Sequence, residues 1–146
     1  MRRTIWLAAL AVMLVLAGTS NAQTKANPGL ERMKSLAGTW QGIRPEGGKF
    51  TVVFRVVSNG TAIEESLNGM EEADMVTLYT SDGDRVMVTH FCSAGNQPRM
   101  ETGAVTGTEK EYDFSFVGAS NLASPSAGHM HHLNVKFDDN DHVTET

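Results

Sequence analysis

Four of the five histidines and the only cysteine lie at the ends of two apolar stretches. The first stretch ends in His90-Phe91-Cys92, and the second begins with His129-Met130-His131-His132. Imidazole and thiolate groups bind transition metals, and imidazole also transfers protons near neutral pH. Alternate side chains of a β-strand share a face, so His90 would lie beside Cys92, and His129 beside His131. These two stretches are the best candidates for a functional site.

Apolar alternation predicts which of these side chains point inward. Residues 133, 135 and 137 are apolar and alternate with polar ones, which gives them the parity of His129 and His131. His132 has the opposite parity and is expected to face solvent, and Met130 is expected to point away from the other two histidines. In the first stretch both faces are apolar, so the alternation pattern supports the inward placement of His90 less strongly.

Three interior histidines could support metal chemistry. A Zn or Cu site requires about three or four ligands, which His90, His129 and His131 could supply, with Cys92 as a conditional fourth. A haem would take one of these histidines as its axial ligand. Interior histidines more often bond to backbone or to a buried polar group. The sequence therefore favours no cofactor and leaves Zn, Cu and haem open.

Small polar segments at residues 93–98 and 121–128 flank the two histidine stretches. Loops commonly carry binding groups, so Asn96, Gln97 and Asn121 could form hydrogen bonds to a ligand beside the histidines. Ordinary turn formation explains the same three residues equally well. Arg99 is expected to be a solvated strand start.

Sequence motifs for specific chemistry are missing. The chain has no Gly-x-Ser-x-Gly elbow, phosphate-binding loop, His-Glu-x-x-His or Cys-x-x-Cys. No catalytic residue is predicted, and enzymatic activity stays an open alternative. The acidic pairs Glu64-Glu65 and Glu71-Glu72 are expected to form solvated rims.

Residues 1–22 are typical of a secretory signal peptide, with Arg2 and Arg3 before an apolar segment and small residues at the cleavage site. A periplasmic or secreted protein is expected, and the apolar segment is too short for a stable membrane span. Cleavage leaves 146 − 22 = 124 residues and takes the formal charge from −5 to −7, because both arginines are lost. An acidic domain argues against nucleic acid as a partner.

Residues 23–27 are expected to be a flexible leader, and residues 28–146 a single domain. Asn27-Pro28 predicts the start of a short helix over residues 28–37. Short β-rich runs with turn residues between them follow. They are predicted at residues 39–44, 49–58, 61–67, 75–80, 85–92, 99–105, 111–118 and 129–137, with a further run that stops at the C-terminus. Asn59-Gly60 predicts a two-residue hairpin turn.

This spacing leaves no room for crossover helices and indicates an all-β, antiparallel up-and-down meander. Closure into a barrel removes exposed strand edges and leaves an interior that holds side chains or one small ligand. A two-sheet sandwich is the alternative. Apolar residues of the second and seventh runs, Phe50, Val52, Phe54, Tyr112, Phe114 and Phe116, are expected to line the inner wall.

Gly38-Thr39-Trp40-Gln41-Gly42 resembles the Gly-x-Trp start of the calycin superfamily, which includes lipocalins, fatty-acid-binding proteins and nitrobindins. The resemblance implies a barrel in which Trp40 closes one end. Residues 90–99 and 124–131 are similar to exported bacterial calycin-like proteins of unassigned activity. That resemblance implies export, brings no known substrate, and suggests that a closing strand follows Thr146.

Three functions follow as hypotheses. The first is an exported, calycin-like barrel that binds a small, partly apolar molecule at a mouth lined by His90, Asn96, Gln97, Asn121, His129 and His131. The second is a metal- or haem-dependent protein that uses His90, His129 and His131. The third is a structural or partner-binding β domain with buried histidines.

Overall fold

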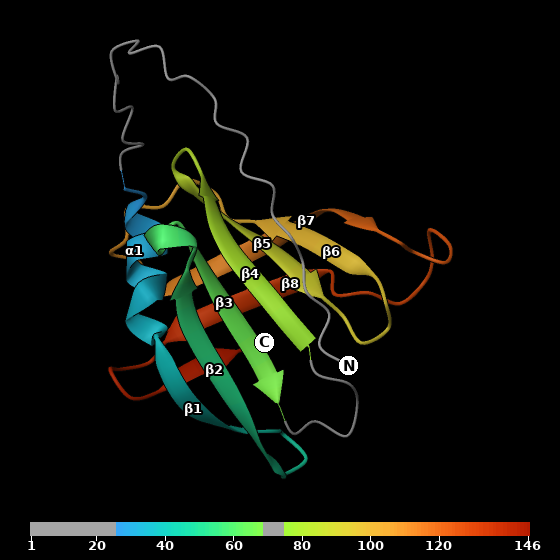
Figure 1. Cartoon of the computed structure of the whole chain (residues 1–146), viewed down its shortest axis with the longest axis horizontal. Coiled ribbons are helices and arrows are strands. Elements are labelled where there is room, and N and C mark those ends of the chain that lie inside the picture. Colours follow the sequence, from blue (N-terminus) through green and yellow to red (C-terminus); the bar gives the residue numbers. More distant parts are fainter. Residues whose placement is uncertain (1–25, 69–74) are drawn as a thin grey trace, which may run out of the picture.

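The computed structural model describes residues 26–68 and 75–146. Nine strands form one antiparallel sheet in which every strand neighbours the next along the chain (Figure 1). A short α-helix, α1 (Pro28–Met33), and a 3-10 turn, η1 (Lys34–Leu36), precede the sheet. The strands are β1 (Gly38–Ile43), β2 (Lys49–Val57), β3 (Ala62–Asn68), β4 (Met75–Asp82), β5 (Arg85–Phe91), β6 (Gln97–Glu101), β7 (Glu111–Ser120), β8 (His132–Phe137) and β9 (Val143–Glu145).

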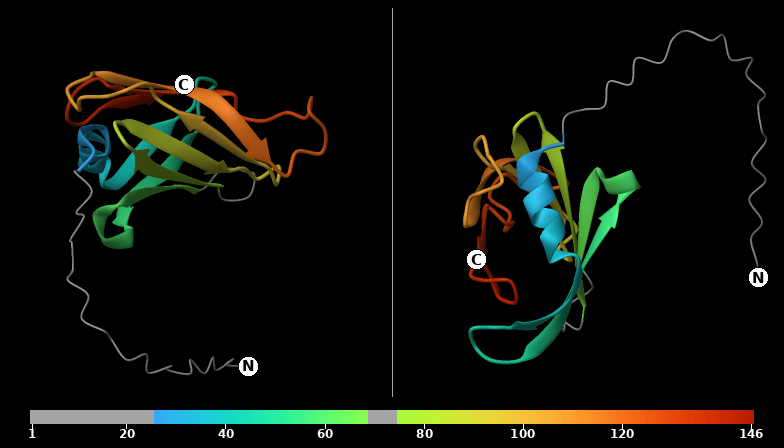
Figure 2. Two further views of the ribbon diagram at one scale, coloured as in Figure 1. Left: turned by 90° about the horizontal axis from the view of Figure 1, so that it is seen from above. Right: turned by 90° about the vertical axis from the view of Figure 1, so that its left-hand side faces the viewer.

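The sheet curls into a half-barrel, and α1 lies across one end of the concave side (Figure 2). Within the described residues the outer strands, β1 and β9, each pair with one neighbour only. The predicted antiparallel up-and-down fold is therefore confirmed in the form of an open curl. No helix within these residues is long and apolar enough to cross a membrane. The predicted signal peptide, residues 23–25 of the predicted leader and the predicted acidic rim Glu71-Glu72 lie outside the described residues.

Strand alternation places the core on the concave face. Buried residues alternate with partly exposed ones along β5 and with exposed ones along the first half of β7. Tyr79, Tyr112 and Phe114 are fully buried, and the Tyr79 and Phe114 rings meet edge-on with centroids 6.1 Å apart. Large aromatic side chains dominate burial energetics, so these three residues anchor the curl.

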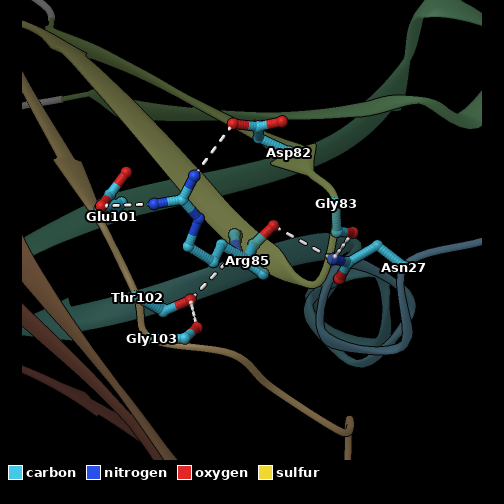
Figure 3. Close-up of polar contacts among 8 residues, drawn as sticks. Asn27, Asp82, Gly83, Arg85, Glu101, Thr102 and Gly103 are labelled. Atoms are coloured by element: carbon cyan, nitrogen blue, oxygen red, sulfur yellow. Dashed lines mark hydrogen bonds and ion pairs between the residues drawn. The ribbon is translucent and has the colours of Figure 1, made fainter.

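Asn27 fixes α1 against the turn between β4 and β5 (Figure 3). Its Oδ1 accepts from the backbone N–H of Leu30 at 2.8 Å, which caps the helix as the sequence predicts. Its Nδ2 donates to the backbone oxygens of Gly83 at 3.0 Å and Arg85 at 3.1 Å. One buried side chain therefore ties the helix start to a hairpin more than fifty residues further along the chain.

Most strand boundaries differ by one or two residues from the sequence prediction, and the differences at the β2–β3 turn, β6 and β8 change the local structure. The β2–β3 pairing ends at Val57 and Ala62, so Asn59-Gly60 lies in a four-residue loop and not in a two-residue turn. Ser58, Asn59 and Gly60 all adopt positive φ there, which the longer loop requires. β6 begins at Gln97 and ends at Glu101, and β8 begins at His132. The last difference changes the environment of the second histidine stretch.

Candidate functional site

A cavity of about 440 Å³ opens on the concave face between β1, β2 and β9. Apolar side chains of β1 and β2 form one wall, and residues of the segment that leads into β9 form the other. The lining consists of Trp40, Gln41, Gly42, Ile43, Phe50, Val52, Phe54, Asp138, Asp141, His142, Val143, Thr144 and Glu145. A second cavity, of about 220 Å³, lies beside η1 and shares Trp40 and Val143 with the first.

The pairing of β1 with β2 determines the apolar wall. Trp40 lies opposite Val52, and Gly42 lies opposite Phe50, so alternate residues of both strands face the cavity. A Cβ atom on Gly42 would lie 2.3 Å from Cζ of Phe50. Glycine at this position is what allows the Phe50 ring to lie across β1.

Trp40 connects the end of the helical segment to this wall. Its indole Nε1 donates to the backbone oxygen of Leu36 at 2.7 Å, and its ring is half-buried and contributes to both cavities. The sequence resemblance implies that Trp40 closes one end of a barrel. In the structure it lies where η1 meets β1.

A row of buried polar side chains crosses the concave face of β3, β4 and β5. Glu65 pairs in register with Thr77, and Thr77 with His90, and each of the three is 3% exposed. Oγ1 of Thr77 lies 3.0 Å from Nδ1 of His90, and its hydroxyl also bonds to the Glu65 carboxyl. Burial lowers the pKa of His90, which keeps the ring neutral.

Glu65 also meets two further groups. The hydroxyl of Tyr79 donates to its Oε2 at 2.7 Å. The carboxyl of Glu145 forms a hydrogen bond with it from β9, across the interior of the curl. Burial raises the pKa of Glu65 even though these bonds oppose the shift. Desolvation raises the pKa of Glu145 well above its usual value, and the charge of Glu65 adds to the effect.

Two carboxyls in contact cannot both ionise cheaply, so the pair retains a proton. Burial, followed by the charges of Glu65 and Glu145, also raises the pKa of Tyr79 well above its usual value, so its hydroxyl remains a donor. Glu145 itself stays exposed to the space it lines. This arrangement can hold a proton or accept a cation at the edge of the cavity.

The prediction that Glu65 forms a solvated rim is wrong, because its carboxyl lies in the interior. The signal was present in the strand parity, since Ile63, Glu65 and Leu67 share one face of β3. The same parity links Val143 with Glu145 on β9. The residues that the sequence interpretation missed are therefore acidic members of otherwise apolar faces.

The structure separates the predicted histidines into two environments. His90 is buried in the Thr77 network, which agrees with an inward orientation. His129 is half-buried and His131 is exposed, and both rings pack on Phe116 with centroids 4.9 and 4.6 Å from it. None of the three lines either cavity. Within residues 26–68 and 75–146, no group of three His, Cys, Asp or Glu side chains is arranged to hold a metal ion.

The inward placement of His131 is wrong, as is the outward placement of Met130, which packs against the core. The prediction extends the alternation from Leu133 back to His129, but β8 begins at His132 and residues 129–131 lie outside the strand. Strict alternation ends where the strand ends. His132 faces solvent as predicted, and its Nε2 lies 2.6 Å from Oδ1 of Asp113.

The two predicted loops lie together and are held by their amide side chains. Nδ2 of Asn96 donates to the backbone oxygen of Gly128 at 3.0 Å, and Nδ2 of Asn121 donates to that of Gly95 at 2.6 Å. Gln97 likewise donates to Gly95 at 2.8 Å. These hydrogen bonds stabilise the turns themselves. Ligand binding by Asn96, Gln97 and Asn121 stays a prediction.

Two acceptors at this loop pair are left without a partner. Oδ1 of Asn96 and Nε2 of His129 are shielded from solvent and form no hydrogen bond with the part of the chain that the structure describes. The other ring nitrogen of His129 lies 2.7 Å from the backbone oxygen of Ala127. Cys92, a free and partly exposed thiol, precedes this loop.

No protein-family model matches the chain, and no curated protein matches it either. Functional inference therefore rests on the geometry.

Proposed function

We propose that this chain is an exported, calycin-like protein that binds one small, partly apolar molecule in the cavity between β1, β2 and β9. The cavity itself supports this function. It has about 440 Å³ of space and is lined by Trp40, Phe50, Val52 and Phe54 on one side. Ligand sites are typically concave, largely apolar and about 300 to 1,000 Å³ in volume.

The position of the binding site differs from the one that the sequence suggests. Three aromatic rings line the cavity, whereas His90 lies outside it and its Nδ1 contacts the hydroxyl of Thr77. Aromatic side chains provide large contact areas at low entropic cost. The apolar wall therefore accounts for affinity, and the polar rim of Gln41, Asp138 and Asp141 for orientation.

Export and calycin relationship are part of the same proposal. Residues 1–22 have the composition of a secretory signal, and residues 38–42 resemble the calycin start. A half-barrel with a helix at one end suits that family. A protein of this kind would act outside the cytoplasm as a carrier or scavenger of its ligand.

Binding of the uncharged fluorophore N-phenylnaphthylamine tests the proposal. Its emission should rise on titration with the protein, because entry into an apolar cavity removes the dye from water. Val143→Trp should abolish the rise by filling the cavity, since Val143 lines it from β9. Val117→Trp is the matched control, because Val117 is 50% exposed on β7 and does not line the cavity.

Circular dichroism of both variants would establish that they fold. A dye that binds neither variant nor the parent protein would contradict the proposed function. Equal binding by Val143→Trp and the parent would place the dye elsewhere on the molecule and would contradict the proposed site.

A second candidate function is binding of a Zn or Cu ion through His129, with His131 as a neighbouring ligand. When the Nδ1 proton of His129 bonds to the Ala127 carbonyl, a lone pair is left on Nε2, the arrangement that orients metal-binding histidines. The two rings are 5.5 Å apart. Titration with Zn²⁺ should give heat that His129→Ala removes and His132→Ala retains. No heat with the parent protein would exclude this candidate.

A further inference from the structure

We propose that the ligand of this cavity carries a basic amine, and that its ammonium group binds at the paired carboxyls of Glu65 and Glu145. This inference rests on the proposed function and adds the chemical class of the ligand. It locates the polar end of the molecule at the β3–β9 contact and its apolar part against the β1–β2 wall.

The two carboxyls meet only because the sheet curls. β3 and β9 are six places apart in the strand order, yet the Glu65 and Glu145 side chains share a hydrogen bond. Glu145 is part of the cavity lining, and its partner Glu65 is 3% exposed and does not itself line the cavity. A cationic group that entered the cavity could therefore contact Glu145 first and approach Glu65 through it.

The pair has no protein cation of its own. Among the described residues, the ion pairs of the chain use other carboxylates, and neither Glu65 nor Glu145 is paired with a lysine, arginine or histidine. Tyr79 and Thr77, both on β4, provide only neutral donors to Glu65. Buried charges are normally paired, so an ionised Glu65 lacks the partner that an ammonium would supply.

The rest of the cavity strengthens this preference for a cation. Its other ionisable lining residues are Asp138, Asp141 and His142. His142, the only basic residue among the described residues of the lining, pairs with Asp139, and Lys136 pairs with Asp138. An anionic ligand would meet this acidic surface with no free basic group in the lining.

The aromatic wall suits the same ligand class. Trp40, Phe50 and Phe54 line the cavity opposite β9. Aromatic faces attract ammonium groups and also bury the hydrocarbon next to them. An aralkyl or alkyl amine can place its hydrocarbon against the aromatic wall and its ammonium group at the acidic pair. An alcohol of the same shape carries no charge to pair with the carboxyls.

Amine binding should exchange one cation for another. Without ligand, the pair retains a proton between its two carboxyls. An ammonium that binds there lets both carboxyls ionise, and the displaced proton leaves to solvent. Binding is therefore coupled to proton release, which neutral ligands do not cause.

Three small molecules of matched shape test the inference: phenethylamine, phenethyl alcohol and hydrocinnamate. Each displaces N-phenylnaphthylamine from the cavity if it binds there. The amine should compete about tenfold more strongly than the alcohol, the margin expected of a charge-assisted over a neutral hydrogen bond, and the carboxylate should be weakest. Calorimetry in buffers of different ionisation enthalpy should detect the released proton with the amine alone.

Glu145→Gln should reduce the affinity for phenethylamine to that for the alcohol. Glu145 is exposed on a three-residue strand, so the variant is expected to fold. Glu111→Gln is the matched control, because Glu111 is an exposed carboxylate at the start of β7 that lines neither cavity, so this variant should retain the amine preference. Glu65→Gln should match Glu145→Gln if the pair acts as a unit.

Failure of the two proposals can be distinguished. If the dye does not bind, the proposed function fails. If the dye binds but the amine competes no better than the alcohol, or binds without releasing a proton, the inference is overturned and the binding function stands. An amine preference that Asp141→Asn removes and Glu145→Gln retains would also overturn it, because the rim would then be the cation site.

Discussion

Asn27 makes three hydrogen bonds whose loss can be assigned separately. Its Oδ1 caps α1 at Leu30. Its Nδ2 bridges Gly83 and Arg85 in the β4–β5 turn (Figure 3). The side chain is 5% exposed, so water cannot replace these contacts fully. Asn27→Ala removes all three bonds, and Asn27→Ser retains an acceptor for the cap and loses the two donors.

The expected cost follows from those contacts. Loss of an N-cap costs about 1 kcal/mol, and each lost hydrogen bond to the buried carbonyls costs about 1 kcal/mol. Asn27→Ala should therefore lower the free energy of unfolding by about 3 kcal/mol, and Asn27→Ser by about 2 kcal/mol. For a domain of this size, 3 kcal/mol corresponds to a fall in Tm of roughly 10 °C.

Urea unfolding monitored by tryptophan fluorescence and by circular dichroism provides the measurement. Trp40 lies next to η1 and reports on the helical end of the domain. A loss below about 1 kcal/mol in Asn27→Ala would refute the reasoning, since it would mean that solvent satisfies the carbonyls of Gly83 and Arg85. Identical losses in Asn27→Ala and Asn27→Ser would refute the separate contribution of the cap.

Two further predictions concern the interior. The raised pKa of Glu65 means that the folded state binds more protons than the unfolded state above about pH 4.5, so the free energy of unfolding should fall as pH rises through the raised pKa. Denaturant titrations across pH should show that Glu65→Gln reduces this fall, and an unchanged slope would show that Glu65 does not titrate with a raised pKa. Phe114→Ala should lower the free energy of unfolding by about 3 to 5 kcal/mol because Phe114 is 0% exposed. Exposed Val117→Ala should change it by less than about 0.5 kcal/mol, and a similar loss in both variants would contradict the assigned core.

Much of the fold could be predicted because its signals are local. Asn27-Pro28 carries the helix start in two residues, and the alternation along β5 and β7 fixes the buried face of each strand. Turn residues then limit the connections to antiparallel neighbours. The degree of curl, and the gap between β1 and β9, depend on the twist accumulated over nine strands, which no short pattern encodes.

The candidate site was harder to predict for the same physical reason. Phe50, Val52 and Phe54 were identifiable as wall residues from their spacing in one strand. Their proximity to Val143 and Glu145 arises from the curl, which brings together segments about ninety residues apart. Imidazole is chemically distinctive, so histidine patterns indicate a candidate site from sequence alone. Glutamate is usually a surface residue, so the contact between Glu65 and Glu145 has no such signal.

A crystal structure of the protein with N-phenylnaphthylamine would test the central claim most directly. The account predicts density for the dye between Trp40 on β1 and Val143 on β9, with its rings against Phe50 and Phe54. Dye bound at the loop of residues 93–98, or a cavity filled by its own side chains with no dye, would contradict the account.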